Sequence, residues 1–265
     1  MTSPRPVAPS PAATLVLLRG RPEGGVEILL IQRHQASKFA GGDFVFPGGK
    51  IEADDMPDDA PARCVGLAPD EATRRLVNAG SAREALGFWA GAIREAFEEA
   101  GILLAYGPGG SLVDFSRSGE RFQAYRRDCL ADGSVFWRML REERLTLATD
   151  RLVYFAHWIT PEENPIRFDT RFFVAEAPPR QEATADEREI VSVRWMTVAD
   201  ALEALRRGEI SLRFPTIKNL KLLKGPSAAA VLASLNGRAV PTIRPRVLGE
   251  GATRRVLLPG DAGWY

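Results

Sequence analysis

Three glutamates crowd into one short stretch of the chain, "AIREAFEEAGIL" (92–103), beside a single arginine. At about 100° per residue of α-helix, Glu98 and Glu99 fall near −60° and +40° relative to Glu95, so the three carboxylates share one face. Apolar residues occupy the opposite face of the same stretch. We therefore expect an amphipathic helix that buries its apolar side and presents a cluster of negative charge.

This acidic face could simply be solvated, as most charged helix faces are, but two features argue against that. Like charges at i,i+4 cost about 0.2–0.5 kcal/mol, and only Arg94 lies nearby in the sequence. Glu98 and Glu99 also fall in the predicted last turn, where the helix dipole disfavours anions. A bound divalent cation would remove both penalties, and Mg²⁺ or Mn²⁺ prefers oxygen ligands completed by water and substrate phosphate.

A second segment, "FVFPGGKIE" (44–52), reads as a short strand that runs into a Gly-Gly loop. Consecutive glycines allow a backbone carbonyl to approach an ion closely, because no Cβ stands in the way. Lys50, directly after them, could meet a phosphate. Taken alone, Pro-Gly-Gly is as well explained by an ordinary turn.

Together the two segments resemble the signature of the Nudix hydrolases, G-x5-E-x7-R-E-U-x-E-E-x-G-U, in which U is a bulky aliphatic residue. "GGKIE" (48–52) matches its beginning and "REAFEEAGI" (94–102) its end. Ala96 stands where a bulkier residue is usual, and about 31 additional residues separate the two halves. If the insertion follows it, Asp55 takes the place of the first glutamate.

An interrupted signature of this kind resembles one subgroup, the coenzyme A diphosphatases, and "FVFPGG" and "RFDTRFFVA" are similar to that subgroup too. The resemblance implies an α+β fold, a Nudix-like α/β/α sandwich with a mixed central sheet, an insertion in the signature and extra C-terminal helices. The order of elements independently suggests a sheet between helices rather than a regular βαβ winding.

The resemblance covers residues 12–235, which we expect to form the Nudix domain. Residues 1–11, rich in Pro, Ser and Ala, are expected to form a disordered tail. The insertion, 53–84, is expected to form a lid or rim beside the site, or else a tolerated surface excursion. Residues 236–265 form a C-terminal extension, in which the short apolar runs after Arg238 leave the elements unplaced.

Hydrophobic periodicity and turn residues predict the elements of the domain. The expected strands are 13–20, 26–34, a short one within 44–52, 151–160, 167–177 and 189–197. The expected helices are 69–80, 82–100 between a Ser81 cap and Gly101, 120–145 with a break near Asp132-Gly133, 198–209, 215–225 and 226–237.

The resemblance also implies roles for the residues of the signature. Glu95, Glu98 and Glu99, helped by the Gly49 carbonyl, would hold one to three Mg²⁺ or Mn²⁺ ions. Arg94 would orient the glutamates by ion pairing. Water, polarised by metal and deprotonated by a carboxylate, would attack one phosphorus of a diphosphate.

The catalytic base varies within the family, so its identity stays open between two kinds of position. It can be a glutamate of the signature, here Glu98, or a glutamate in a loop before a late strand. "ADEREIVSVRW" offers Glu187 and Glu189 for the second kind. Glu189 fits better because it directly precedes the expected strand, although either side chain could simply be a solvated loop residue.

Coenzyme A carries an adenine and a 3′-phosphate, so its site needs a further cation and a surface for the base. Arg167 and Arg171 flank "FDT", and Phe44 and Phe46 alternate on a strand, so that one of the two rings could line a pocket. Each of these arginines, like Arg33 and Lys38 in "QRHQASKFAGG" (32–42), is more readily explained as a surface residue than as a ligand. The candidate substrate-binding residues are Arg33, Lys38, Phe46, Lys50 and Arg171.

We expect a divalent-metal-dependent hydrolase that cleaves the diphosphate of coenzyme A or acyl-coenzyme A, giving 4′-phosphopantetheine, or its acyl form, and adenosine 3′,5′-bisphosphate. ADP-ribose, or another nucleotide diphosphate derivative, is the alternative substrate. A regulatory binding module that has lost catalysis is the alternative from another class. Such modules typically lose the carboxylates of the signature, whereas this chain keeps all three.

Composition limits the classes of partner and the cellular compartment that we expect. The 265-residue chain has a formal net charge of +1 and no basic stripe with interleaved aromatics, which argues against nucleic acid as a partner. No apolar run approaches the roughly 20 residues that span a bilayer. Two distant cysteines favour a reduced, cytoplasmic setting over a disulfide. A homodimer is an open alternative, since relatives are often dimers.

Overall fold

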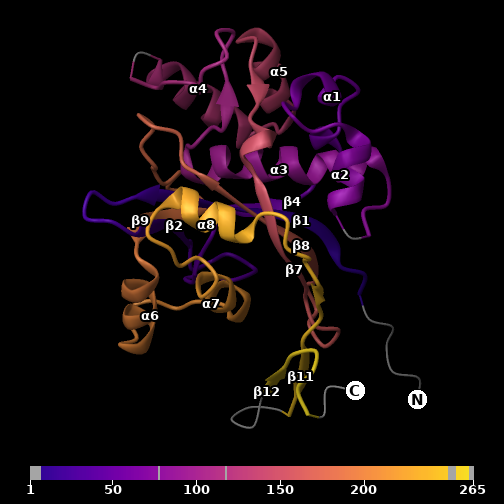
Figure 1. Ribbon diagram of the computed structural model, residues 1–265, viewed down its shortest axis with the longest axis vertical. Coiled ribbons are helices and arrows are strands. Elements are labelled where there is room, and N and C mark those ends of the chain that lie inside the picture. Colours follow the sequence, from indigo (N-terminus) through magenta and orange to yellow (C-terminus); the bar gives the residue numbers. More distant parts are fainter. Residues whose placement is uncertain (1–6, 77, 117, 250–254, 263–265) are drawn as a thin grey trace.

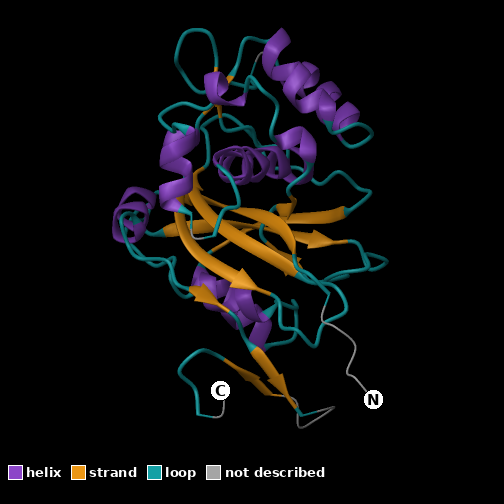
Figure 2. Ribbon diagram, turned by 90° about the vertical axis from the view of Figure 1, so that its right-hand side faces the viewer, coloured by secondary structure: helices purple, strands orange, loops and turns teal. Residues whose placement is uncertain are grey.

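The computed structural model describes residues 7–76, 78–116, 118–249 and 255–262. In this part of the chain, one mixed sheet lies between two groups of helices (Figures 1 and 2). Its strands are β1 (Ser10–Gly20), β2 (Val26–Arg33), β3 (Phe44–Val45), β4 (Gly48–Lys50), β7 (Val153–Ile159), β8 (Phe168–Glu176), β9 (Ile190–Met196) and β10 (Thr242–Ile243). The predicted α+β sandwich is confirmed.

The sheet has the order β10-β7-β8-β1-β2-β3, with β4 also paired to β1 and β9 to β2. The pairs β1–β8 and β10–β7 are parallel, and the other pairs are antiparallel. β1 is the central strand, and its side chains alternate between two hydrophobic cores, as the period of a strand requires. Leu15 and Leu17 belong to one core, and Val16 and Leu18 to the other.

The helices divide between these two cores. The first core holds α3 and the smaller helices beyond it, and the second holds the C-terminal helices, which lie on the other face of the sheet (Figure 1). The first group is α1 (Ala60–Arg63), α2 (Pro69–Arg75), α3 (Ala82–Ala100), α4 (Gly119–Cys129) and α5 (Ser134–Glu142), and the second is α6 (Val198–Arg206), α7 (Phe214–Leu220) and α8 (Ala228–Leu235). The predicted helix break near Asp132-Gly133 is confirmed.

The long helix α3 begins and ends where the sequence predicts. The Ser81 hydroxyl accepts a hydrogen bond from the Glu84 N–H at 3.1 Å, which satisfies one N–H of the first turn. Gly101 ends the helix in the left-handed region at φ 72°, a conformation that glycine adopts without strain. These two signals fix the ends of the helix, and burial of the apolar stripe that includes Ile93 fixes its rotation, which turns Glu95 to the other face.

The insertion packs on α3 and is tied to α5. It begins with the 3-10 turn η1 (Ala53–Asp55) and continues through α1 and α2. A Cβ added at Gly87 would lie 2.6 Å from Cγ of Met56, so glycine there lets the insertion approach the helix closely. Asp59 is bound by Arg63 and by Arg141 of α5, with Nε–Oδ2 distances of 2.9 Å in both cases.

Two of the predicted boundaries need correction at the ends of the domain. β1 starts at Ser10, inside the segment 1–11 predicted as a tail, because Ser10 pairs with Phe168 of β8 and its N–H donates to the Arg167 carbonyl at 2.9 Å. Residues 1–6 of that tail lie outside the described residues. The C-terminal extension is not separate from the domain either, since β10 joins the sheet edge beside β7.

After β10, the strands β11 (Arg246–Leu248) and β12 (Arg255–Leu257) form a hairpin that projects from one end of the molecule in Figure 1. A further short ladder joins β5 (Ala105–Tyr106) to β6 (Thr146–Leu147). Sequence patterns missed these strands because each has only two or three residues, too few to show a period.

A buried polar cluster holds β10 against the sheet. Nδ1 of His157 lies 2.9 Å from the Thr242 hydroxyl, and Nε2 lies 2.5 Å from Asp169, which also pairs with Arg171 at 2.6 Å. Burial alone would raise the pKa of Asp169, but the hydrogen bond from His157 and the charge of Arg171 lower it overall. The ionised aspartate therefore stabilises this corner of the fold.

Neither cysteine is bonded to the other, as predicted. Cys64 and Cys129 are buried free thiols, and burial raises the pKa of each to about 12. Among the described helices, none has both the length and the hydrophobicity needed to cross a bilayer.

Candidate metal and diphosphate site

A cavity of about 750 Å³ extends from β4 and the acidic face of α3 across one end of the sheet. We call the part of the cavity nearest α3 the carboxylate end. It is defined by residues from β2, β4, α3 and the loop before β9: Arg33, Gly48, Gly49, Lys50, Glu95, Glu99 and Glu189. Segments far apart in the sequence thus meet where the two halves of the signature come together.

Glu99 is fixed by the glycine loop and by β2. Its carboxylate accepts a hydrogen bond from the Gly48 N–H at 2.7 Å and pairs with Nη1 of Arg33 at 3.0 Å. The residue is only 5% exposed. Burial and the nearby charge of Glu95 raise the pKa of Glu99 well above its ordinary value, although the charge of Arg33 opposes this.

Glu95 lies directly against the backbone of β4. A Cβ added at Gly49 would be 2.5 Å from Oε1 of Glu95, so only glycine permits this approach. Burial raises the pKa of Glu95, and the charge of Arg94 only partly offsets that rise. The Gly49 backbone and the Glu95 carboxylate, both predicted as metal ligands, therefore lie next to each other.

Arg94 binds carboxylates from both halves of the signature. Its Nε and Nη2 donate to the two oxygens of Asp55, at 2.7 and 3.0 Å, and its Nη1 donates to Glu98 at 2.8 Å. Nη2 also lies 3.0 Å from Glu95 and donates to the Lys50 carbonyl at 3.0 Å. Asp55, which the signature places at the first glutamate, is therefore the buried counter-ion of the arginine.

Glu98 is held back from the cavity by the same arginine. Its Oε2 pairs with Arg94, while its Oε1 is buried without a hydrogen-bond partner. Burial raises the pKa of Glu98 to about 7, and the charge of Arg94 opposes this less strongly. One buried carboxylate oxygen next to the site therefore has no hydrogen-bond partner in the described structure.

The negative charge at this end exceeds the positive charge that faces it. Asp55 and the three glutamates of α3 contact two arginines, Arg94 and Arg33. In the described part of the chain, no three carboxylate, imidazole or thiol side chains are already closed around a single point. The surplus of anionic oxygen, including the unpartnered Oε1 of Glu98, is nevertheless the donor chemistry that Mg²⁺ and Mn²⁺ prefer.

The two candidate bases in the loop before β9, Glu187 and Glu189, differ in whether they line the cavity. Glu189 lines the cavity, its side chain is 64% exposed, and it lies 3.7 Å from Nη2 of Arg33. Its backbone N–H donates to Asp186 at 2.8 Å, which fixes the turn that carries it. Glu187 is exposed, adopts a φ of 64° and is absent from the cavity wall.

The structure brings most of the predicted substrate-binding residues to the cavity. Arg33, Phe46 and Lys50 line it. Phe44 is instead a core residue, 1% exposed, so the two alternating rings divide as predicted between core and pocket. Lys38 is exposed and does not line the cavity, although the next residue, Phe39, does.

The prediction that Arg171 binds substrate needs correction. Its side chain is 1% exposed, pairs with Asp169 and lies over the ring of Phe88, 4.3 Å from the centroid. It also donates to the Asn78 carbonyl at 3.2 Å. Arg171 has the opposite orientation to the cavity-lining Thr170 because successive side chains of a strand point to opposite faces.

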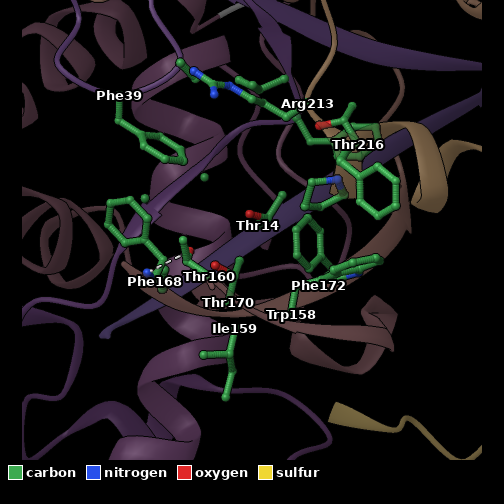
Figure 3. Close-up of a pocket in the computed structure, with 18 of the residues that line it drawn as sticks. Thr14, Phe39, Trp158, Ile159, Thr160, Phe168, Thr170, Phe172, Arg213 and Thr216 are labelled. Atoms are coloured by element: carbon green, nitrogen blue, oxygen red, sulfur yellow. Dashed lines mark hydrogen bonds between the residues drawn. The ribbon is translucent and has the colours of Figure 1, made fainter. Parts of the chain in front are cut away.

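Sequence reasoning missed the aromatic and polar wall of the rest of the cavity. Figure 3 shows Phe39, Phe168, Trp158 and Phe172 around the hollow, with Arg213 on the side away from Ile159. The charge of Arg213 lies over the Phe39 ring at 5.3 Å and pairs with Asp43. Phe168, Trp158 and Phe172 lie on strands, where aromatic residues usually belong to the core, and Phe39 lies in a loop, so no sequence signal marked these residues as a cavity wall.

A model of the NUDT19 Nudix domain matches residues 10–223. The chain belongs to this Nudix family. The match spans both halves of the interrupted signature and agrees with the resemblance to the coenzyme A diphosphatase subgroup.

Relatives and a solved structure agree with this assignment. The Nudix chain is 28% identical over 225 residues to the acyl-coenzyme A diphosphatase NUDT19 of Xenopus laevis, covering 74% of this chain and 59% of the frog protein. It is 29% identical over 283 residues to the human protein of the same name, covering 92% of this chain and 73% of that one.

The crystal structure of a NUDIX hydrolase from Alicyclobacillus acidocaldarius is 26% identical, with a TM-score of 0.73, covering 88% of this chain and 99% of that one. The chain thus spans about three fifths of the length of the frog relative and nearly all of the bacterial structure.

The insertion in the Nudix signature does not form the predicted lid or rim. Of its described residues, none lines the cavity, and α1 and α2 lie beside α3 in Figure 1. It is also more than a surface excursion, because its first turn supplies Asp55 to Arg94. The insertion therefore supports the site by binding Arg94, without lining the cavity.

Asp55→Ala is expected to lower the free energy of unfolding by about 3 kcal/mol or more, since removing one partner of a buried ion pair leaves the other charge under-compensated. Asp54→Ala, at the exposed neighbour in the same turn, is the matched control and should change stability little. Urea denaturation of both variants measures the difference. Equal stabilities would show that the Asp55–Arg94 pair does not support the site.

Proposed function

We propose that this Nudix domain is a divalent-metal-dependent hydrolase that cleaves the diphosphate linkage of coenzyme A or acyl-coenzyme A. The products are 4′-phosphopantetheine, or its acyl form, and adenosine 3′,5′-bisphosphate. The observation that carries the proposal is the position of the α3 glutamates, which meet the Gly48-Gly49 backbone at one end of a large, partly aromatic cavity. The names of the frog and human relatives support the choice of substrate.

The ion would be held by Glu95, Glu98 and Glu99 with the Gly49 carbonyl. When bound, Mg²⁺ or Mn²⁺ would neutralise charge at the phosphates and would polarise the attacking water. The carboxylates contribute the negative charge, and Arg94 keeps them in one region by ion pairs at 2.8 and 3.0 Å. Its bidentate bond to Asp55 holds the Arg94 guanidinium in place.

Glu189 is the proposed base, because it is exposed, lines the cavity and lies 3.7 Å from Nη2 of Arg33 at the carboxylate end. It would take one proton from the attacking water as that oxygen bonds to phosphorus, while the bridging oxygen leaves with the other phosphate. Glu98 suits this role less well, since its Oε2 is already paired with Arg94. Arg33 and Lys50 line the same end and would bind the phosphate oxygens.

The substrate is tested by incubating the purified protein, with Mg²⁺ or Mn²⁺, with coenzyme A, an acyl-coenzyme A, ADP-ribose, NADH and a nucleoside triphosphate. Mass spectrometry should find preferred release of 4′-phosphopantetheine, or its acyl form, and adenosine 3′,5′-bisphosphate. Preferred cleavage of ADP-ribose would keep the chemistry and overturn the substrate. Binding of metal and nucleotide without any cleavage would favour a regulatory module.

Glu189→Gln is expected to lower kcat by about 100-fold or more, the usual contribution of a general base, while Glu187→Gln, two residues away and outside the cavity, should retain activity. Glu98→Gln should abolish turnover as the loss of a metal ligand. Steady-state kinetics on the best substrate of the panel separates the cases. Full activity in Glu189→Gln, or a large loss in Glu187→Gln, would contradict the assignment of the base.

A further inference from the structure

The floor of the cavity is one transverse row of the central sheet. The strands β4, β1, β8, β7 and β10 each place one residue in this row, which runs Lys50, Ala12, Thr170, Trp158 and Ile243. The first four of these residues line the cavity. At about 4.8 Å between strands, β7 lies roughly 14 Å and β10 roughly 19 Å from β4. The cavity therefore has a long axis that leads away from the carboxylate end.

The far part of this axis, which we call the apolar end, is formed by the end of β7, by α7 and by the C-terminal hairpin. Its apolar residues are Trp158, Ile159, Pro161, Phe214, Pro245, Val247 and Val256, and the uncharged polar residues Thr160, Asn164 and Thr216 from the same segments also line the cavity. Trp158 and Phe214 form an edge-to-face pair with centroids 6.1 Å apart. Val247 and Val256 lie directly opposite each other in the β11–β12 ladder.

Charge distinguishes the two ends of the cavity. In the described structure, its cationic wall residues are Arg33 and Lys50 at the carboxylate end, and Arg213, which pairs with Asp43. The apolar end has no charged side chain among its described residues. A 3′-phosphate placed there would lose water without gaining a counter-ion, which is costly, whereas an aliphatic chain would gain by burial.

The length of the pantetheine arm agrees with a substrate that runs from the carboxylate end to the apolar end. The pantetheine arm of coenzyme A has as many bonds between its phosphate oxygen and its sulfur as about four peptide residues, which reach at most about 14 Å when extended. With the diphosphate at the carboxylate end and the arm extended along this row, the sulfur reaches β7. Carbon atoms joined to that sulfur continue toward β10 and the hairpin.

We propose that the apolar end is a subsite for the aliphatic acyl chain of a thioester substrate, with Val247 and Val256 as its outer wall. The inference rests on the proposed function and adds a preference for acylated over free coenzyme A. The hairpin suits this role because it would itself gain stability from a bound acyl chain. A two-stranded ladder is marginal by itself in water, so a chain packed against its valine pair stabilises it.

The test compares kcat/KM for free, acetyl-, butanoyl- and octanoyl-coenzyme A. In the wild type, the ratio of octanoyl to free coenzyme A should exceed about tenfold, since each buried methylene contributes roughly fourfold. Val247→Asp should lower that ratio by about tenfold. Val247→Thr, which keeps the branched shape that suits a strand, should lower it less and serves if the aspartate variant does not fold.

Leu248→Asp is the matched control, because Leu248 is the next residue of β11, points to the other face of the hairpin and is 40% exposed. Its octanoyl preference should equal that of the wild type. Cleavage of all four compounds without chain-length preference, or equal losses in the Val247 and Leu248 variants, would overturn the subsite alone. Cleavage of none of them would overturn the proposed function, and the subsite with it.

Discussion

The guanidinium of Arg94 is the centre on which the site is built. It lies 5% exposed on α3 and contacts Asp55, Glu95 and Glu98 within 3.0 Å. A buried charge of this kind is tolerated only when its donors are satisfied, and breaking such a pair is costly. The arginine therefore fixes the end of β4, the first turn of the insertion and the acidic face of α3 relative to one another.

The same constraint explains how an interrupted signature can still make one site. The chain leaves the site after Asp55, forms α1 and α2, and returns through α3. Because Asp55 is bound before the excursion begins and Arg94 is bound after it, the intervening segment need only close the loop. Small residues of α3, such as Gly87, let it pack closely instead of projecting toward the cavity.

Sequence alone predicted the local chemistry well where residue type and period agree. The Ser81 cap, the Gly101 end and the spacing of the glutamates gave α3 and its acidic face. The spatial role of the insertion and of Arg171 could not be obtained in this way, because each depends on which face of a neighbouring element it meets. The strand register turns Arg171 into the protein, and only the pairing of β10 with β7 brings the C-terminal hairpin to the cavity.

The central claim is that the excess carboxylate charge beside Arg94 serves to hold a divalent cation. Its most direct test is thermal unfolding of the protein with and without Mn²⁺, compared with the variant Glu95→Gln/Glu99→Gln. At 100 times its Kd, a bound ion contributes about 2.7 kcal/mol, which corresponds to a rise in Tm of roughly 5–10 °C.

We predict this rise for the wild type and its loss in the double variant. An equal shift in both proteins, or none in the wild type, would contradict the account.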